Sequence, residues 1–515
     1  MIPFFSWQQR EEGRNLVSML ITGVFMLLWL YTGTVPIVWD TTTTLVMCFG
    51  IWMAASMLWT NSRQSSQDLY MMICGLVVFL VARRIELSML LWILFAPGVV
   101  FAAASLFYRN AKHPKKKWPI FGNPNHIGAF LLVPLFSGAW LTFNVSWWIA
   151  PLVVLIAVAL SLNQCRGAQL GALAGLTFIA CTQSPWMFFL LPVVVVVAWA
   201  VYQSTRNRGI FDRKGVRDVS GSNWHRLSMW IAALRLIQKT PMTGYGLRTF
   251  RREYPSVVPE IIKSKFFAKG ASIESQTSHR IHNDHLEIIF ELGLVGYAIF
   301  IALFSSLQWA ASPLLAGAVI AFAVHGLFFF PLREAHTAYP FWALAGGMAT
   351  TPIPVITINP IIGLVLFCVV CRILYEVGVK MLGLSYYDQS VKIAVAPNPT
   401  DKVGREALAK RQQYINNAIK CDPYNNIYLT EGYYYNVFDN PEPAFQYASR
   451  CMENYDGGKV KWGVADQYAR ALLRLGGFGV AKMAVKYALH ICPDFKQSIE
   501  LMGQIKQMEV PKVAA

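Results

Sequence analysis

Residues 278–285, with the sequence Ser-His-Arg-Ile-His-Asn-Asp-His, close a long polar interval that begins at Gln203. The interval holds fifteen Lys and Arg against six Asp and Glu, a surplus of nine positive charges. The whole chain of 515 residues has a net charge of +17, so this interval supplies more than half of the excess. Hydrophobic runs flank it on both sides, and the chain is therefore organised around one basic polar segment that contains histidines.

The rest of the chain has the composition of a membrane protein. Hydrophobic residues make up 55% and charged residues 14%, whereas soluble domains carry about a quarter charged residues. A helix that crosses a hydrocarbon core of about 30 Å needs about 20 mostly apolar residues. About twelve runs predict such helices, and the pattern is weakest at 336–350. They are 16–38, 43–60, 68–82, 86–107, 126–142, 147–162, 167–182, 185–202, 286–307, 312–330, 336–350 and 354–375.

The hydropathy pattern predicts four parts of the chain. Residues 1–202 are N-terminal transmembrane helices, 203–285 the basic loop, 286–380 C-terminal transmembrane helices, and 381–515 a polar helical domain. In this last part Pro423 and Pro493 lie seventy residues apart, close to two periods of the tetratricopeptide repeat of about 34 residues. We expect a TPR-like domain there; the alternative is a few irregular helices packed on the membrane domain.

The number of crossings predicts which polar segments share a side of the membrane. The turn at Asn125 follows four predicted spans, the junction at Arg166 follows six, and the basic loop follows eight. All three numbers are even, so these segments open on one side, and a tail after twelve spans returns to it. The basic residues near the membrane give conflicting orientations by the positive-inside rule, because Arg83-Arg84 and Lys115-Lys116-Lys117 are one crossing apart.

Two arginines are candidates for binding an anion. Arg166 stands at the end of an apolar run, where an ionisable residue is a functional candidate; the alternative is a helix anchor that snorkels to the headgroups. Arg226 begins a predicted surface helix over 226–237, where a solvated basic face is the alternative. A guanidinium suits a diphosphate because its planar fork donates two parallel hydrogen bonds and stays charged.

The histidines that close the interval favour a general base over a metal site. His279, His282 and His285 are spaced by three, and on a helix the outer two would diverge by about 120°. The sequence contains no paired-histidine zinc motif and no phosphate-binding glycine loop. We therefore expect no metal, no cofactor and no nucleic acid partner. Imidazole titrates near neutrality and can accept a hydroxyl proton, although a solvated side chain is the alternative for any one histidine.

Several motifs together resemble one family. The order of these motifs is that of the O-antigen ligase/polymerase-type membrane glycosyltransferases, a superfamily that includes the bacterial protein O-oligosaccharyltransferases. The resemblance covers about residues 40–350, and the chain departs from it at His285 and at Asn163-Gln164-Cys165. The motifs are the Phe121-Gly122-Asn123-Pro124-Asn125 turn; the junction from Ser161 to Gly167; the series Arg226, Trp230, Pro241, Gly244, Tyr245, Gly246, Phe250 and Tyr254; and His282-Asn283-Asp284-His285-Leu286 with Glu291, Gly293 and Gly296.

The resemblance implies a metal-independent enzyme that uses an undecaprenyl-diphosphate glycan donor. His282 matches the family's essential histidine, and Arg166 and Arg226 match its functional arginines. We expect an all-α, GT-C-like polytopic protein of the bacterial inner membrane, with its loop and active site in the periplasm. The glycan would pass to an acceptor hydroxyl on a lipid or a protein. Further contacts to the substrate are expected from Arg248, Asn125, Tyr245 and Asp284.

Three other functions are weighed against this one. A polymerase would add repeat units to another lipid-linked glycan. A transporter of the same lipid belongs to a different class, and it is disfavoured because the sequence shows no repeated halves with broken helices. The third alternative is a membrane anchor for a repeat-protein scaffold, which would give Arg166 and His282 no function.

Overall fold

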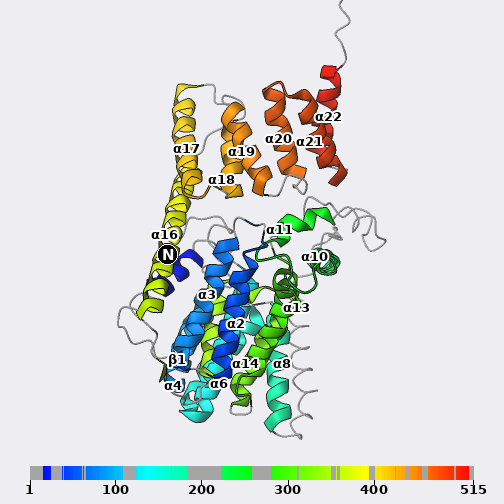
Figure 1. Ribbon diagram of the computed structural model, residues 1–515. Helices are drawn as coiled ribbons and strands as arrows, with labels where there is room; N and C mark the ends of the chain where they lie inside the picture. The colour runs from blue at the N-terminus through cyan, green and yellow to red at the C-terminus, as the bar shows by residue number, and fades with distance from the viewer. Residues whose placement is uncertain are drawn as a thin grey trace, which may run out of the picture.

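The computed structural model describes an all-helical protein, apart from one pair of short strands. Figure 1 shows a bundle formed by α2 to α8 and α13 to α15, with α10 and α11 at one end and α17 to α22 beyond them. The described residues are 15–24, 37–38, 40–60, 62, 65–107, 123–163, 165–183, 222–257, 280–309, 312–349, 355–356, 360–393, 401–423, 425–436, 441–454, 462–491 and 495–509.

Four of the described helices are long and apolar enough to cross a membrane. They are α3 (Ser65–Ala82), α4 (Leu87–Phe107), α6 (Pro124–Asn144) and α13 (Asp284–Ser305). Shorter apolar helices accompany them, and together they make this a multi-pass membrane protein. The shorter ones are Asn15–Val24, α2 (Thr41–Ser56), η2 with α7 (Trp147–Ile149 and Ala150–Leu162) and α14 (Pro313–Gly326).

Three further predicted spans form helices that are not among the four long apolar ones. The run 167–182 forms α8 (Arg166–Gln183), and the run 354–375 overlaps the long helix α16 (Pro360–Val391). The run 336–350 forms α15 (Ala335–Gly347), whose 13 residues give only about 20 Å of helix. It lies inside the bundle against α3, α4 and α6, which explains its weak pattern. The predicted span 185–202 lies outside the described residues.

Small residues let α8 and α14 pack closely. An added Cβ at Gly171 would stand 2.2 Å from the Ala321 carbonyl oxygen, and one at Gly175 would stand 2.3 Å from that of Gly317. A side chain at either glycine would therefore separate the two helices. In membranes such close approach matters, because helix association relies on packing rather than on a hydrophobic driving force.

Helix α13 is broken at Gly293, which has φ 69° and ψ −176°. Carbonyls beside the break find partners outside the helix: Phe290 O accepts from Tyr245 N at 2.8 Å, and Glu291 O accepts from Gly246 N at 2.8 Å. Leu292 O accepts from Trp52 Nε1 at 2.9 Å. The turn from Pro241 to Gly246 thus packs against the break at Gly293. The glycines of the turn and of α13 therefore allow the same close contact.

The polar interval forms short helices at one end of the bundle. These are α10 (Ser222–Ile237), α11 (Phe250–Glu253) and η4 (Tyr254–Ser256). The predicted helix over 226–237 is confirmed. The pairing of β1 (Ile37–Val38) with β2 (Val355–Ile356) joins two distant parts of the chain.

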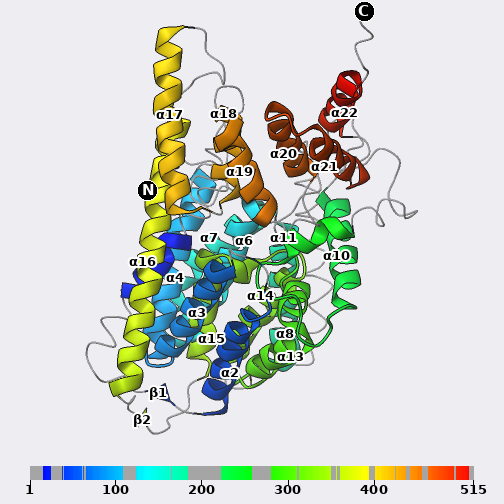
Figure 2. The ribbon, with the colours of Figure 1, turned by 45° about the horizontal axis from the view of Figure 1, so that its top comes forward.

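The C-terminal part is a row of helices in which each packs on the next. One buried cluster joins Met229 and Phe250 of the polar interval to Ala465 and Ala488 of this part. The row therefore lies on the same side of the bundle as the polar interval, as Figure 2 also shows. Its helices are α17 (Lys402–Cys421), α18 (Asn426–Asn436), α19 (Pro441–Asn454), α20 (Trp462–Arg474), α21 (Phe478–Ile491) and α22 (Lys496–Glu509).

Candidate functional site

His282 lies two residues before the start of α13, in a constrained backbone conformation. Its φ is +58°, in the left-handed region that residues other than glycine rarely adopt. The preceding residue is held from both sides, because Ile281 O accepts from Trp230 Nε1 at 3.1 Å and Ile281 N donates to Glu287 Oε2 at 3.0 Å. Such conformations persist only where the surroundings enforce them, and they concentrate at functional sites.

The aromatic segment after α14 brings His282 close to the start of α6. The His282 ring packs edge-to-face on Phe330, with 4.8 Å between centroids. The His126 ring packs in the same way on Phe329, at 4.9 Å. Phe329 and Phe330 stack on each other at 4.3 Å. Residues 126, 282 and 329–330, which are distant in the sequence, therefore form one wall.

The starts of α6 and α8 lie side by side at this wall. Asn163 Nδ2 donates to Pro124 O at 2.6 Å, and Cys165 Sγ donates to Asn125 Oδ1 at 3.3 Å. Burial raises the pKa of the Cys165 thiol to about 11, so this cysteine is a neutral donor and not a nucleophile. Asn125, which the sequence predicts as a substrate contact, is thus fixed next to the junction that carries Arg166.

Arg226 is a partly buried cation beside this junction. Its guanidinium acts electrostatically on Cys165 and on His325, and His325 is 1% exposed and packs against Gly167. Among the described residues Arg226 makes no ion pair, and its Nε is buried without a hydrogen bond. Burial lowers the pKa of Arg226, but a guanidinium stays charged in proteins. A positive charge is therefore held here without a carboxylate of its own.

Helix N-termini add positive potential to the same region. α6 begins at Pro124, α8 at Arg166 and α13 at Asp284, and the contacts above connect the first turns of all three. The helix dipole makes such termini favourable for anions. Arg166 is the first residue of α8 and is exposed. The arrangement can bind an anion with several charges next to an imidazole.

The other predicted contacts belong to a buried ionic cluster that holds the loop onto the bundle. Arg248 donates its backbone N–H to Glu291 Oε1 at 2.7 Å, and its Nη1 lies 3.3 Å from Asp68 Oδ1. Arg280 bridges Asp68 and Glu287. The two carboxylates raise the pKa of Arg280 well above its usual value, against the opposing effect of burial. Arg248 thus has protein partners.

Asp284 and Tyr245 are also engaged with the protein. Asp284 is buried, and its Oδ2 accepts from Leu332 N at 2.9 Å. The fully buried Arg333 lies 3.9 Å from Asp284 and 2.7 Å from Glu291. Tyr245 stacks on Phe290 with 5.0 Å between centroids, and burial raises the pKa of its hydroxyl. The structure therefore gathers His282, Arg226, Arg166 and Asn125, and gives Arg248, Asp284 and Tyr245 structural partners.

One group of described residues has ligand-type atoms close enough to share a metal ion. Atoms of His126, Glu334 and His336 lie within 4.8 Å of one another, and His336 Nε2 is 3.1 Å from His126 Nδ1. Glu334 also accepts from Asn15 Nδ2 at 3.1 Å. His279, which the sequence considered with His282 and His285, lies outside the described residues. Among the described residues the group that geometry offers to a metal is thus His126, Glu334 and His336, and neither His282 nor His285 belongs to it.

Sequence reasoning missed several residues of this region. His325 and Arg333 lie in or beside the apolar run 312–330, where an ionisable residue already signals a site. His126 and Glu287 each occur once on a helix without a motif of their own. Only the fold shows that His126 lies against His336 and that Glu287 pairs with Arg280.

These features define a class of protein: a multi-pass membrane protein with a cationic site and an imidazole at one end of its bundle. Residues 151–301 match the family model described as O-Antigen ligase. The matched segment contains Arg166, Arg226 and His282. The chain thus carries an O-antigen ligase domain, and this family implies a glycosyltransferase or ligase with a lipid-linked glycan donor in a membrane. No curated protein matches the chain.

Proposed function

We propose that this protein transfers a glycan from an undecaprenyl diphosphate to an acceptor hydroxyl. The observation that carries the proposal is Arg226, a partly buried guanidinium without an ion pair in the described part of the chain. It lies beside the first turn of α8, which adds Arg166 and the positive end of the helix dipole. A diphosphate fits such a site by charge and by hydrogen-bond geometry.

In the proposed reaction His282 accepts the proton of the acceptor hydroxyl as that oxygen attacks the anomeric carbon. The new glycosidic bond forms while the bond from the anomeric carbon to the diphosphate oxygen breaks. The electron pair leaves with the diphosphate, and Arg166 and Arg226 stabilise the added negative charge. Because the two guanidiniums neutralise the leaving group, the proposed mechanism needs no metal ion. Asn125 is positioned to contact the donor from the start of α6.

The proposed topology places this site in the periplasm. Twelve crossings put the turn at Asn125, the junction at Arg166, the loop 203–285 and the tail on one side of a bacterial inner membrane. The packing of Ala465 and Ala488 against Met229 supports a tail and a loop on the same side. Within this proposal, 1–202 and 286–380 form the membrane domain and 381–515 a TPR-like domain that positions the acceptor.

Alkaline phosphatase fused after Ala515 tests this orientation. The enzyme folds only where its disulfides form, outside the cytoplasm, so we expect an active fusion. An inactive fusion would place the tail in the cytoplasm and separate it from the periplasmic acceptor.

The acceptor can be a lipid, a protein or a growing glycan. A tail over the catalytic side favours an acceptor that is positioned from outside the membrane. If the acceptor is a second lipid-linked glycan, the same reaction makes the protein a polymerase. Both activities use the same cationic site.

The direct test is transfer by purified protein in liposomes that contain a fluorescent undecaprenyl-diphosphate glycan. We expect the label to appear on an added lipid-core or pilin-like acceptor, with undecaprenyl diphosphate as the second product. A longer glycan on undecaprenyl diphosphate would identify a polymerase instead. Movement of intact labelled lipid between leaflets, with no new glycosidic bond, would identify a transporter and refute the proposal.

A further inference from the structure

An indole N–H from the loop helix α10 holds the peptide group that precedes His282. Trp230 Nε1 donates to Ile281 O at 3.1 Å, across 51 positions of sequence. α10 packs on α13, and the ring of the partly buried Trp230 lies 6.5 Å from that of Phe328, centroid to centroid. A tryptophan from the polar interval is thus fixed beside the proposed base.

The bond from Trp230 acts on the backbone angle that is unusual at His282. Ile281 O belongs to the planar peptide group that ends at the nitrogen of His282, so a rotation of this group changes φ of His282. That angle is +58°, which is unfavourable for a residue with a Cβ atom. Without the bond, the peptide group is free to turn toward a negative φ, and the imidazole then moves with it.

The chain on the other side of His282 is held by the bundle. Asn283 is the N-cap of α13, and its Oδ1 accepts from Leu286 N at 3.0 Å. Asp284 N donates to Phe329 O at 3.2 Å. These bonds fix the residues after His282, whereas Trp230 fixes the residue before it. His282 therefore lies between a segment that is anchored in the bundle and a contact that comes from the loop.

The same helix carries the proposed donor-binding arginine. Arg226 precedes Trp230 by four residues on α10, and residues with this spacing are neighbours on one helix face. Arg226 acts electrostatically on His325 of α14, and Trp230 lies against Phe328, which follows that helix. One helix therefore fixes the cation relative to the base.

We propose that Trp230 is a positioning residue that holds the imidazole of His282 in the orientation needed to reach the acceptor hydroxyl. The inference rests on the proposed function and adds a residue that acts through the base without touching the substrate. Proton transfer depends first on geometry, so loss of this N–H should lower kcat. Donor binding depends on Arg226 and Arg166, so KM for the donor should stay near that of the parent.

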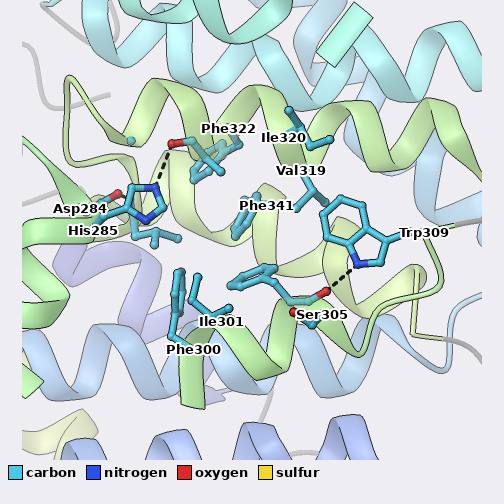
Figure 3. Close-up of a pocket in the computed structure, with 14 residues that line it drawn as sticks. Asp284, His285, Phe300, Ile301, Ser305, Trp309, Val319, Ile320, Phe322 and Phe341 are labelled. Carbon is cyan, nitrogen blue, oxygen red and sulfur yellow. Dashed lines mark hydrogen bonds between the residues drawn. The ribbon is translucent and has the colours of Figure 1, made fainter. Parts of the chain in front are cut away.

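The test removes the N–H and keeps an aromatic ring, as Trp230→Phe does. Trp309→Phe is the matched control, because Trp309 is also partly buried and donates its Nε1 to Phe304 O at 2.8 Å. Figure 3 shows that bond as a dashed line, at the opposite end of a cavity from Asp284 and His285. Both variants lose the same kind of hydrogen bond, and only one of them loses it beside the proposed base.

Three measurements on the full-length protein follow these variants. In steady-state kinetics Trp230→Phe should lose about five- to tenfold in kcat, the effect of one net hydrogen bond, with KM for the donor within about twofold. Trp309→Phe should keep both constants. Amide hydrogen exchange should become faster at residues 281–284 in Trp230→Phe only. In a His282→Ala background, Trp230→Phe should change the residual rate less than about twofold, because no imidazole is left to position.

The outcomes separate this inference from the proposed function. If Trp230→Phe keeps the parental kcat and exchange while His282→Ala is defective, the inference fails and the proposed function stands. The inference also fails if Trp230→Phe acts through KM for the donor, or costs as much without the imidazole as with it. Normal transfer by His282→Ala, or no transfer by the parent, would overturn the proposed function and this inference with it.

Discussion

Two groups of arginines on the same side of the bundle differ in their partners. Arg280 and Arg333 lie among the carboxylates of Asp68, Glu287 and Glu291, with Arg280 2.5 Å from Asp68 and Arg333 2.7 Å from Glu291. Arg226 faces His325 and Cys165, and no carboxylate pairs with it in the described part of the chain. The first group holds the loop to the membrane helices, and the second leaves positive charge for a ligand.

The difference shows that partners, and not residue type, decide what a buried arginine does. A charge that is already neutralised by protein carboxylates has little left for a substrate. A charge without such a partner is costly in the free protein and is stabilised when an anion arrives. Arg248, which the sequence predicted as a substrate contact, has protein partners of the first kind.

The largest expected effect is the loss of His282. General base catalysis contributes about 10²–10⁴-fold, so His282→Ala should lose at least a hundredfold in transfer rate while the melting temperature stays near that of the parent. Steady-state transfer assays measure the rate. His490→Ala, an exposed histidine on α21, is the matched control and should transfer normally. Near-parental activity of His282→Ala would remove this residue from the mechanism.

Breaking the ionic cluster should act on stability. Arg333→Met leaves buried carboxylates without their partner, which typically costs about 3–5 kcal/mol. Lys392→Ala removes an exposed i,i+4 pair with Asp388, and such pairs contribute about 0.3–0.5 kcal/mol. Thermal unfolding in detergent should therefore show a melting temperature several degrees lower for Arg333→Met only. Equal melting temperatures would contradict the structural role of this cluster.

Arg226 and Arg166 should instead affect donor binding. A charge-assisted hydrogen bond is worth about 1.5–3 kcal/mol, so Arg226→Lys and Arg166→Lys should each lose roughly ten- to hundredfold in kcat/KM for the donor. Lysine keeps the charge but not the planar fork. Kinetics at saturating acceptor isolate the donor step. If both variants match the parent, these arginines anchor helices.

The smallest expected effect is that of chelation. If arginines neutralise the diphosphate, transfer should continue in excess EDTA at close to the untreated rate. Activity that is lost in EDTA and regained with one divalent ion would instead assign a role to His126, Glu334 and His336.

The sequence predicted much of the membrane domain, because apolar runs have few conformations available in lipid. The runs at 86–107 and 126–142 became α4 and α6 with ends moved by only one or two residues. The 286–307 run became α13, but its break at Gly293 was not predicted, since the break depends on the distant turn at Pro241 to supply hydrogen-bond partners.

The candidate site was predicted only in part. Arg166, Arg226 and His282 carried signals of their own, as charges beside apolar runs or within an ordered motif. Glu287 carried none, because its role comes from the neighbours that folding gives it. The ionisable residue His325 in an apolar run was the one missed signal.

By itself the sequence determined the membrane setting, the helical class and the candidate charges, because these follow from local composition and from hydrogen bonding in lipid. The tertiary structure decided which charges are neutralised. Arg280 and Arg226 have the same side chain and the same basic surroundings in the sequence, yet only Arg280 meets Asp68. This ion pair joins residues 212 positions apart, so no local sequence pattern predicts it.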